Sequence, residues 1–142
     1  MTEDVIEQLE ESIDDDDFGY IAENCMQELD ESGAGIQAVE PLLELMERHP
    51  LLDFGMSDAI VRYAEQFFGK GYEKLLVSSI ERRPNLHNVW MLDRIRTYLD
   101  NEGRDEEAED YRDIIRAVLD RTDTEDEIKD LVRQLNLSLI HI

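Results

Sequence analysis

Apolar residues recur every three or four positions along most of this chain, a spacing that places them on one face of a helix. No segment alternates between apolar and polar residues over the length of a strand, so the pattern predicts an all-α protein. Weaker stripes predict a short opening helix over residues 5–13 and a further helix from Pro41 to Arg48, because proline favours the first turn of a helix. The clearest stripes lie within residues 18–29, 60–68, 72–80, 91–99, 108–119 and 128–135.

Short segments that contain glycine or proline separate these stripes. Glycine ends a helix in the left-handed conformation, and proline prevents its continuation. Seven or eight short helices result, and successive helices start roughly 15 to 20 residues apart, so that one pair has the length of a unit in a helical repeat array. We therefore expect antiparallel pairs stacked into an irregular right-handed α-solenoid of the HEAT-like kind, with a compact helical bundle as the alternative. The separating segments are residues 32–35, 49–50, 69–71, 83–85 and 101–103.

The length of 142 residues is that of one domain, which can bury a sizeable core without disulfides or a structural metal. The last six residues differ from the rest, because they contain no acid, lysine or arginine and include four aliphatic residues. We expect a single helical domain over residues 1–136 and an apolar tail outside it over residues 137–142.

Acidic residues are concentrated in the N-terminal third of the chain. The net charge is −22, and residues 1–50 contain sixteen acids and one base, Arg48. Residues 51–100 are neutral, with seven acids and seven bases, while residues 101–142 carry thirteen acids and six bases. A surface of this charge repels nucleic acid and anionic lipid and attracts basic proteins. The predicted partner is therefore a basic macromolecule, and we expect no direct binding of nucleic acid.

Other features of the composition indicate a cytoplasmic protein. Its one cysteine cannot form an internal disulfide, which agrees with a reducing compartment. The first residues are acidic and lack the basic region and apolar run of a secretory signal. No apolar stretch approaches the roughly 20 residues that a membrane-spanning helix needs, so we expect no membrane partner.

The acidic run at residues 14–17 resembles the start of a calcium-binding loop, with carboxylates at the first and third positions and Gly19 at the sixth. Phe18 stands at the fifth position and Cys25 at the twelfth, where oxygen ligands are required, so the calcium loop is incomplete. The run is then either a solvated turn between two helices or an acidic patch that faces a partner.

No other segment has the residue pattern of a catalytic or metal site. Asp53-Phe54-Gly55 matches the magnesium-binding tripeptide of protein kinases, but no glycine-rich loop or catalytic-loop motif accompanies it. Cys25 lies on an apolar stripe, and His49 and His87 lack the spacing of a zinc site or a hydrolytic dyad. We expect no enzymatic activity and no cofactor, with Phe54 filling a gap between two helix pairs while Asp53 points outwards.

Trp90 lies away from the centre of the apolar face of its helix, beside Arg94. Two interpretations fit this position: the indole fills a second core in a layered array, or it is an exposed aromatic anchor for a partner. Several arginines lie in the same neutral block, where we expect them to neutralise acids of the flanking blocks. They are Arg62, Arg82, Arg83, Arg94 and Arg96.

Four segments in the middle of the chain carry a resemblance to a known family. They are HPLLDFG at 49–55, AIVRYAEQF at 59–67, GYEKLL at 71–76 and RPNLHNVWML at 83–92. This region, about a third of the chain, resembles small acidic all-helical immunity proteins of bacterial polymorphic-toxin and contact-dependent inhibition systems. The resemblance implies a cytoplasmic protein that binds one cognate toxin domain and blocks it, and it carries over no catalytic residue.

Charge and resemblance point to the same function. Nuclease toxins need basic surfaces to hold phosphates, so a dense carboxylate surface can occupy the same groove and compete with substrate. We expect an immunity protein that covers or occludes the active site of a cognate, basic nuclease toxin domain. The alternatives are a DNA-mimic inhibitor of a nucleic-acid-binding protein and a non-catalytic helical-repeat adaptor. The residues expected to bind the partner are Glu10, Glu11, Asp14, Asp15, Asp16, Asp17, Asp53, Phe54, Tyr63 and Trp90.

Overall fold

The computed structural model describes residues 2–52 and 58–139, the last four of these by their backbone alone. Over these ranges the chain forms eight α-helices and two short 3₁₀ helices and contains no strand, which confirms the all-α prediction. The α-helices are α1 (Thr2–Glu11), α2 (Phe18–Ser32), α3 (Val39–Arg48), α4 (Asp58–Glu65), α5 (Tyr72–Arg82), α6 (Leu86–Asn101), α7 (Asp105–Ala117) and α8 (Asp126–Leu139).

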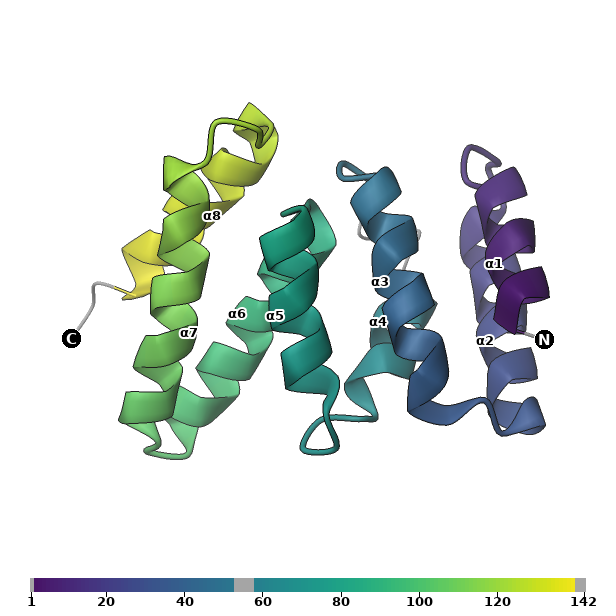
Figure 1. Ribbon diagram of the computed structural model, residues 1–142, viewed down its shortest axis with the longest axis horizontal. Helices are drawn as coiled ribbons and strands as arrows, with labels where there is room; N and C mark the ends of the chain where they lie inside the picture. The colour runs from purple at the N-terminus through teal and green to yellow at the C-terminus, as the bar shows by residue number, and fades with distance from the viewer. Residues whose placement is uncertain (1, 53–57, 140–142) are drawn as a thin grey trace.

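The helices form a row of antiparallel pairs that follow one another in chain order, with the two termini at opposite ends of the row (Figure 1). One layer consists of α1, α3, α5 and α7, and the other of α2, α4, α6 and α8 (Figure 1). Successive pairs contact each other within a layer, since α1 packs on α3, α3 on α5, α2 on α4 and α6 on α8. The most extensive contact joins α6 to α7. This two-layered row of helix pairs is the arrangement of an α-solenoid.

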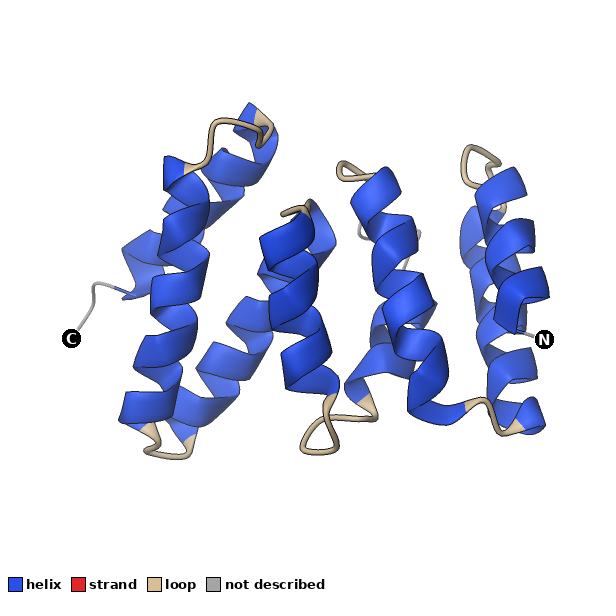
Figure 2. Cartoon of the chain, viewed as in Figure 1, coloured by secondary structure: helices blue, strands red, loops and turns tan. Residues whose placement is uncertain are grey.

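The connections between helices lie along the two long edges of the row (Figure 2). Capping residues determine where several of these helices begin or end. Helix α2 ends at Gly33, whose φ of 71° lies in the left-handed region that glycine adopts without strain. Helix α6 begins with a reciprocal cap, in which the Asn85 side chain accepts from the Asn88 backbone and the Asn88 side chain accepts from the Asn85 backbone, both at 2.8 Å.

Two predicted boundaries differ from the structure. Helix α3 begins at Val39, two residues before the expected start at Pro41, because a 3₁₀ helix, Gly35–Ala38, leads directly into it. Pro41 is then the third residue of the helix, where its missing N–H removes no helical hydrogen bond. At the other end, α8 continues to Leu139, so residues 137–139, which we expected in the tail, are helical.

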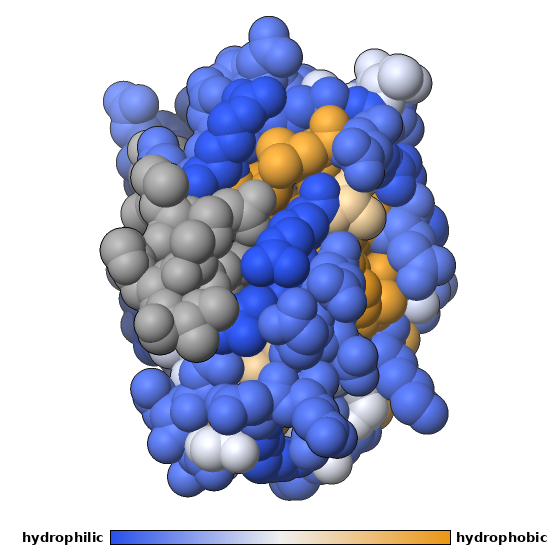
Figure 3. Space-filling model, turned by 90° about the vertical axis from the view of Figure 1, so that its left-hand side faces the viewer, coloured by the Kyte–Doolittle hydropathy of each residue, from blue (hydrophilic) through white to orange (hydrophobic). Residues whose placement is uncertain are grey.

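One hydrophobic core runs through the whole row and fills the space between the layers. It includes most residues of the apolar stripes predicted from the sequence, with Phe68 and Tyr98 as exposed exceptions, and Cys25 is buried within it as expected. Burying a leucine or phenylalanine of this kind contributes roughly 1.5 to 3 kcal/mol. Figure 3 shows the end of the row formed by α7 and α8, where hydrophilic residues cover most of the surface and hydrophobic ones appear between them. The largest fully buried side chains are Phe18, Tyr72, Leu9, Leu29, Leu42, Leu43, Leu45, Met46, Ile60, Leu76, Met91 and Leu92.

A buried polar network joins α3, α5 and α6. The Glu47 carboxylate accepts hydrogen bonds from the Ser79 hydroxyl at 2.8 Å and from two nitrogens of Arg82 at 2.9 and 3.0 Å. The Ser79 hydroxyl in turn accepts from the Asn88 side-chain amide at 3.0 Å. Because buried polar groups need their partners, this network fixes how the α5–α6 pair packs against α3.

Candidate partner-binding surface

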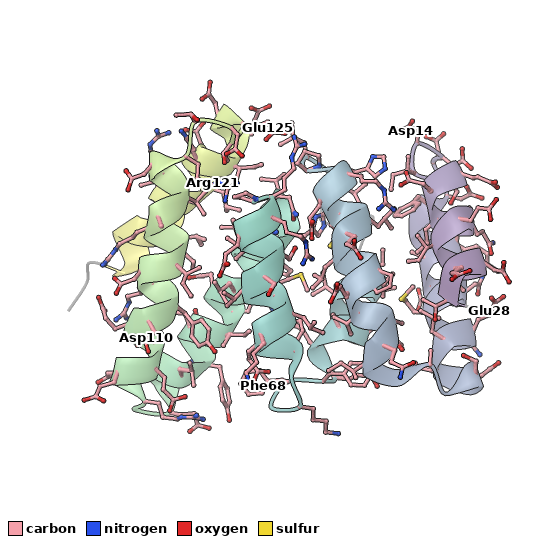
Figure 4. All side chains as sticks on the ribbon, viewed as in Figure 1. Asp14, Glu28, Phe68, Asp110, Arg121 and Glu125 are labelled. Carbon is pink, nitrogen blue, oxygen red and sulfur yellow. The ribbon has the colours of Figure 1, made fainter. Side chains whose placement is uncertain are left out.

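The acidic residues of the first fifty positions lie on α1, α2, α3 and their connections, at the N-terminal end of the row. Of these sixteen acids, Glu10, Glu23 and Glu47 have an ion-pair partner among the described residues, and Glu23 has it at 3.9 Å from Arg62. Most of the others are exposed, as Figure 4 shows for Asp14 at the α1–α2 turn and Glu28 on α2. This end of the protein therefore presents carboxylates that form no ion pair within the described residues.

In the rest of the row, in contrast, many acidic residues form ion pairs with arginines. All five arginines of the predicted cluster make ion pairs, but only some of their partners lie in the flanking blocks, where we expected them. Arg82 and Arg83 pair with acids of the flanking blocks. Arg62 pairs with Asp58 of its own block at 2.9 Å and lies 3.9 Å from Glu23, while Arg94 and Arg96 also pair with acids of their own block. The C-terminal block also contains its own pairs, which include Arg104 with Glu107, Arg112 with Glu109, Arg121 with Asp123 and Arg133 with Asp130.

Glu10 is the predicted binding residue that the fold already uses. Arg48 donates to its carboxylate at 2.6 Å, and His49 contacts the second oxygen, so that the end of α1 is tied to the end of α3. Burial alone would raise the pKa of Glu10, but the hydrogen bonds from Arg48 and His49 outweigh it and lower the pKa below its usual range. Glu10 therefore contributes to packing, whereas Glu11 and Asp14 to Asp17 are exposed and unpaired in the described chain.

Two adjacent grooves lie between the helices of the layer formed by α1, α3 and α5. The first, of about 280 Å³, lies between α1 and α3, and the second, of about 620 Å³, lies between α3 and α5. Half-buried apolar side chains lie in both, and exposed glutamates line them: Ile6, Pro41, Glu3 and Glu7 in the first, and Ile36, Leu75, Pro41, Glu40 and Glu44 in the second. Lys74 is the one basic residue among the groove-lining side chains. Such a surface can bind apolar and cationic side chains together.

The aromatic residues expected as anchors lie elsewhere. Tyr63 is 3% exposed, and its hydroxyl donates to the Gly35 carbonyl at 2.8 Å. It joins α4 to the 3₁₀ helix inside the core, so the structure removes it from the candidate surface. Trp90 is half-buried against the core, and the Arg94 guanidinium lies 5.0 Å from its ring centroid, which favours the packing interpretation over the exposed anchor. Asp53 and Phe54 lie outside the described residues.

A third groove, of about 520 Å³, was not anticipated from the sequence. Phe68 and Tyr98, 36% and 45% exposed, meet edge to face on its wall with ring centroids 5.2 Å apart. Phe68 lies at the lower edge of the row in Figure 4. In the same groove Glu65 pairs with Arg94 at 2.6 Å, and burial raises the pKa of the Tyr72 hydroxyl. Because Glu65 and Arg94 neutralise each other here, this groove lacks the charge of the other two.

The described part of the chain contains neither a candidate metal site nor a candidate membrane-spanning helix. Within residues 2–52 and 58–139, no three His, Cys, Asp or Glu side chains are grouped so that they could hold a metal ion. In the same ranges no helix combines the length and apolar character that crossing a membrane requires. No protein-family model, curated protein or solved structure matches this chain. The charged surface and its grooves are therefore the features that indicate a function.

Proposed function

We propose that this chain is a cytoplasmic, non-catalytic immunity protein that binds a cognate basic toxin domain, a nuclease, and covers or occludes its active site. The observation that carries the proposal is the set of exposed, unpaired carboxylates on α1, α2 and α3. A nuclease presents cations where it holds phosphates, so these carboxylates can take the place of the phosphates. The resemblance of residues 49–92 to immunity proteins supports the same conclusion.

Electrostatic attraction has a specific role in this proposal. Complementary charge raises association rates to about 10⁸ M⁻¹s⁻¹ or more at low salt, which suits an inhibitor that must act before its target reaches nucleic acid. Charge alone gives weak selectivity between basic partners, so apolar contacts in desolvated grooves must provide the rest. The grooves beside α3 supply such contacts within the acidic surface.

Co-expression with the product of the neighbouring gene tests the proposal. Cells that express the toxin domain should survive only with this chain, and the purified proteins should form a one-to-one complex. The complex should persist in a pull-down at about 0.5 M salt, where attraction between exposed charges is largely screened. Absence of both rescue and complex formation would refute the immunity function.

A DNA mimic that inhibits nucleic-acid-binding proteins through charge alone is the main rival, and the same experiment separates the two. A mimic would protect equally against unrelated basic nucleases, and its complexes would dissociate at about 0.5 M salt. A cognate immunity protein should protect against one toxin and fail against nucleases of equal net charge.

A further inference from the structure

We infer that the two grooves on the α1–α3–α5 layer together hold one basic amphipathic helix of the partner, which lies across the three helices. The inference rests on the proposed function, since it names the element of the partner that this surface recognises. The unpaired carboxylates alone would attract any basic protein; the two grooves add a shape that selects one kind of segment.

Each groove combines an apolar part with a carboxylate rim. In the groove between α1 and α3, half-buried Ile6 and Pro41 are flanked by exposed Glu3 and Glu7. In the groove between α3 and α5, half-buried Ile36 and Leu75 lie beside exposed Glu40 and Glu44, and Lys74 is the one cation of the lining. These four glutamates have no ion-pair partner among the described residues, and they lie where basic side chains beside an apolar anchor would end. Each groove can therefore take one apolar side chain of the partner together with its cationic neighbours.

The spacing of the grooves selects a helix rather than an extended strand. Pro41 lines both grooves, so only the width of α3 separates them. Packed helices lie about 8 to 10 Å apart, and a helix rises 1.5 Å per residue, so apolar side chains about seven residues apart reach both grooves from one face. An extended segment covers about 10 Å in three residues, and side chains three residues apart point to opposite sides.

Charge decides between the classes of occupant. A second copy of this chain, with a net charge of −22, would bring carboxylates against carboxylates, and nucleic acid or anionic lipid would do the same. Lysines and arginines between the two apolar anchors would instead lie near Glu7, Glu40 and Glu44. The occupant is therefore cationic and amphipathic, as a helix on a basic toxin domain would be.

Two synthetic peptides test the inference without a toxin. Both are fluorescein-labelled, about 18 residues long and made of the same lysines, leucines and alanines, but only one places its leucines seven positions apart on one helical face. Fluorescence anisotropy at about 0.15 M salt should show at least about tenfold tighter binding of the patterned peptide to the whole protein, since one well-buried anchor accounts for that factor. Equal affinities would mean that only charge is recognised and would overturn the inference.

Matched variants locate the site. The double variant Glu7→Gln, Glu44→Gln should lose at least about fivefold more affinity for the patterned peptide than the double variant Glu106→Gln, Glu127→Gln. The second variant removes the same charge from exposed positions on α7 and α8. Equal losses from the two double variants would overturn the inference. Because these four positions are exposed, all variants should keep the wild-type circular dichroism spectrum.

An apolar variant tests the groove itself. Leu75→Gln should lower the affinity for the patterned peptide by about tenfold. The affinity for the other peptide, whose leucines are not on one face, should not change, because only the patterned peptide places an apolar side chain in the groove. An equal effect on both peptides would count against the groove. Rescue of cells from the toxin together with equal affinities for both peptides would keep the proposed function but overturn this site, so the two proposals fail separately.

Discussion

At the scale of single residues, two glutamates three positions apart on α3 illustrate two roles of acidic side chains in this protein. Glu44 is exposed, lines the groove beside α5 and has no ion-pair partner in the described chain. Glu47 is 9% exposed and accepts hydrogen bonds from Ser79 and Arg82. Although both are glutamates of one short helix, one belongs to the candidate surface and the other to the fold.

Replacing these two glutamates should change stability by very different amounts. Glu47→Ala should lower the free energy of unfolding by about 2 kcal/mol, because the buried Ser79 hydroxyl and the Arg82 guanidinium lose their acceptor. Glu44→Ala is the matched control and should change it by less than about 0.5 kcal/mol. Urea denaturation measures both differences, and equal effects of the two substitutions would contradict the assignment.

Glu10 should make stability depend on pH. Its pKa is lowered in the folded protein, so it contributes stability that is complete above its unfolded pKa of about 4.3 and is lost as the pH falls through the folded value. Glu10→Gln should therefore lower the free energy of unfolding by about 1 kcal/mol near pH 6, and this difference should shrink below about pH 4. Denaturant titrations of both proteins at these pH values measure it. A difference that stays constant would exclude the ion pair as its cause.

At the scale of elements, the acidic side chains of the α1–α2 turn do not hold the turn together. Backbone hydrogen bonds hold the turn, from Asp15 to the Ser12 carbonyl at 2.9 Å and from Phe18 to the Asp15 carbonyl at 3.0 Å. Asp17 precedes the first residue of α2, yet its side chain makes no capping hydrogen bond. The backbone and the buried Phe18 therefore form this turn, and the four carboxylates remain exposed to solvent.

Changing Asp14, Asp15, Asp16 and Asp17 to Asn should consequently leave the melting temperature unchanged or raise it, because like charges are removed and no native contact is lost. Association with the proposed basic partner should become slower and depend less on salt, with little change in dissociation. Calorimetry and stopped-flow kinetics give the two results. Unchanged association would remove this turn from the encounter surface.

The helices themselves could be predicted from the sequence because apolar periodicity and the glycine and proline segments agree. The faces of the helices were harder to predict. Phe67 and Phe68 continue one apolar stripe, yet the structure half-buries the first and exposes the second. Because α4 ends at Glu65, both residues lie in the following turn and not on the helix that the stripe predicted. Tyr63 and Glu47 likewise depend on elements distant in sequence, the 3₁₀ helix for one and α5 for the other.

At the scale of the whole molecule, stability should respond to salt. The described carboxylates of the N-terminal helices repel one another, and added ions screen that repulsion. Raising sodium chloride from about 0.05 to about 0.5 M should increase the melting temperature. The variant with Asn at residues 14–17 should gain less, since it begins with less repulsion. Scanning calorimetry measures both, and a fall in the wild-type melting temperature would show that the ion pairs of the C-terminal half dominate.

The order of the helix pairs along the row affects how the protein is oriented as it approaches a charged partner. Because the pairs follow one another in chain order, residues 2–50, with a net charge of −15, occupy one end, while residues 101–139, with −7, occupy the other (Figure 1). The molecule therefore has a permanent electric dipole along its length. In the field of a positive surface it experiences a torque that turns α1, α2 and α3 toward that surface, so that many random approaches become correctly oriented collisions.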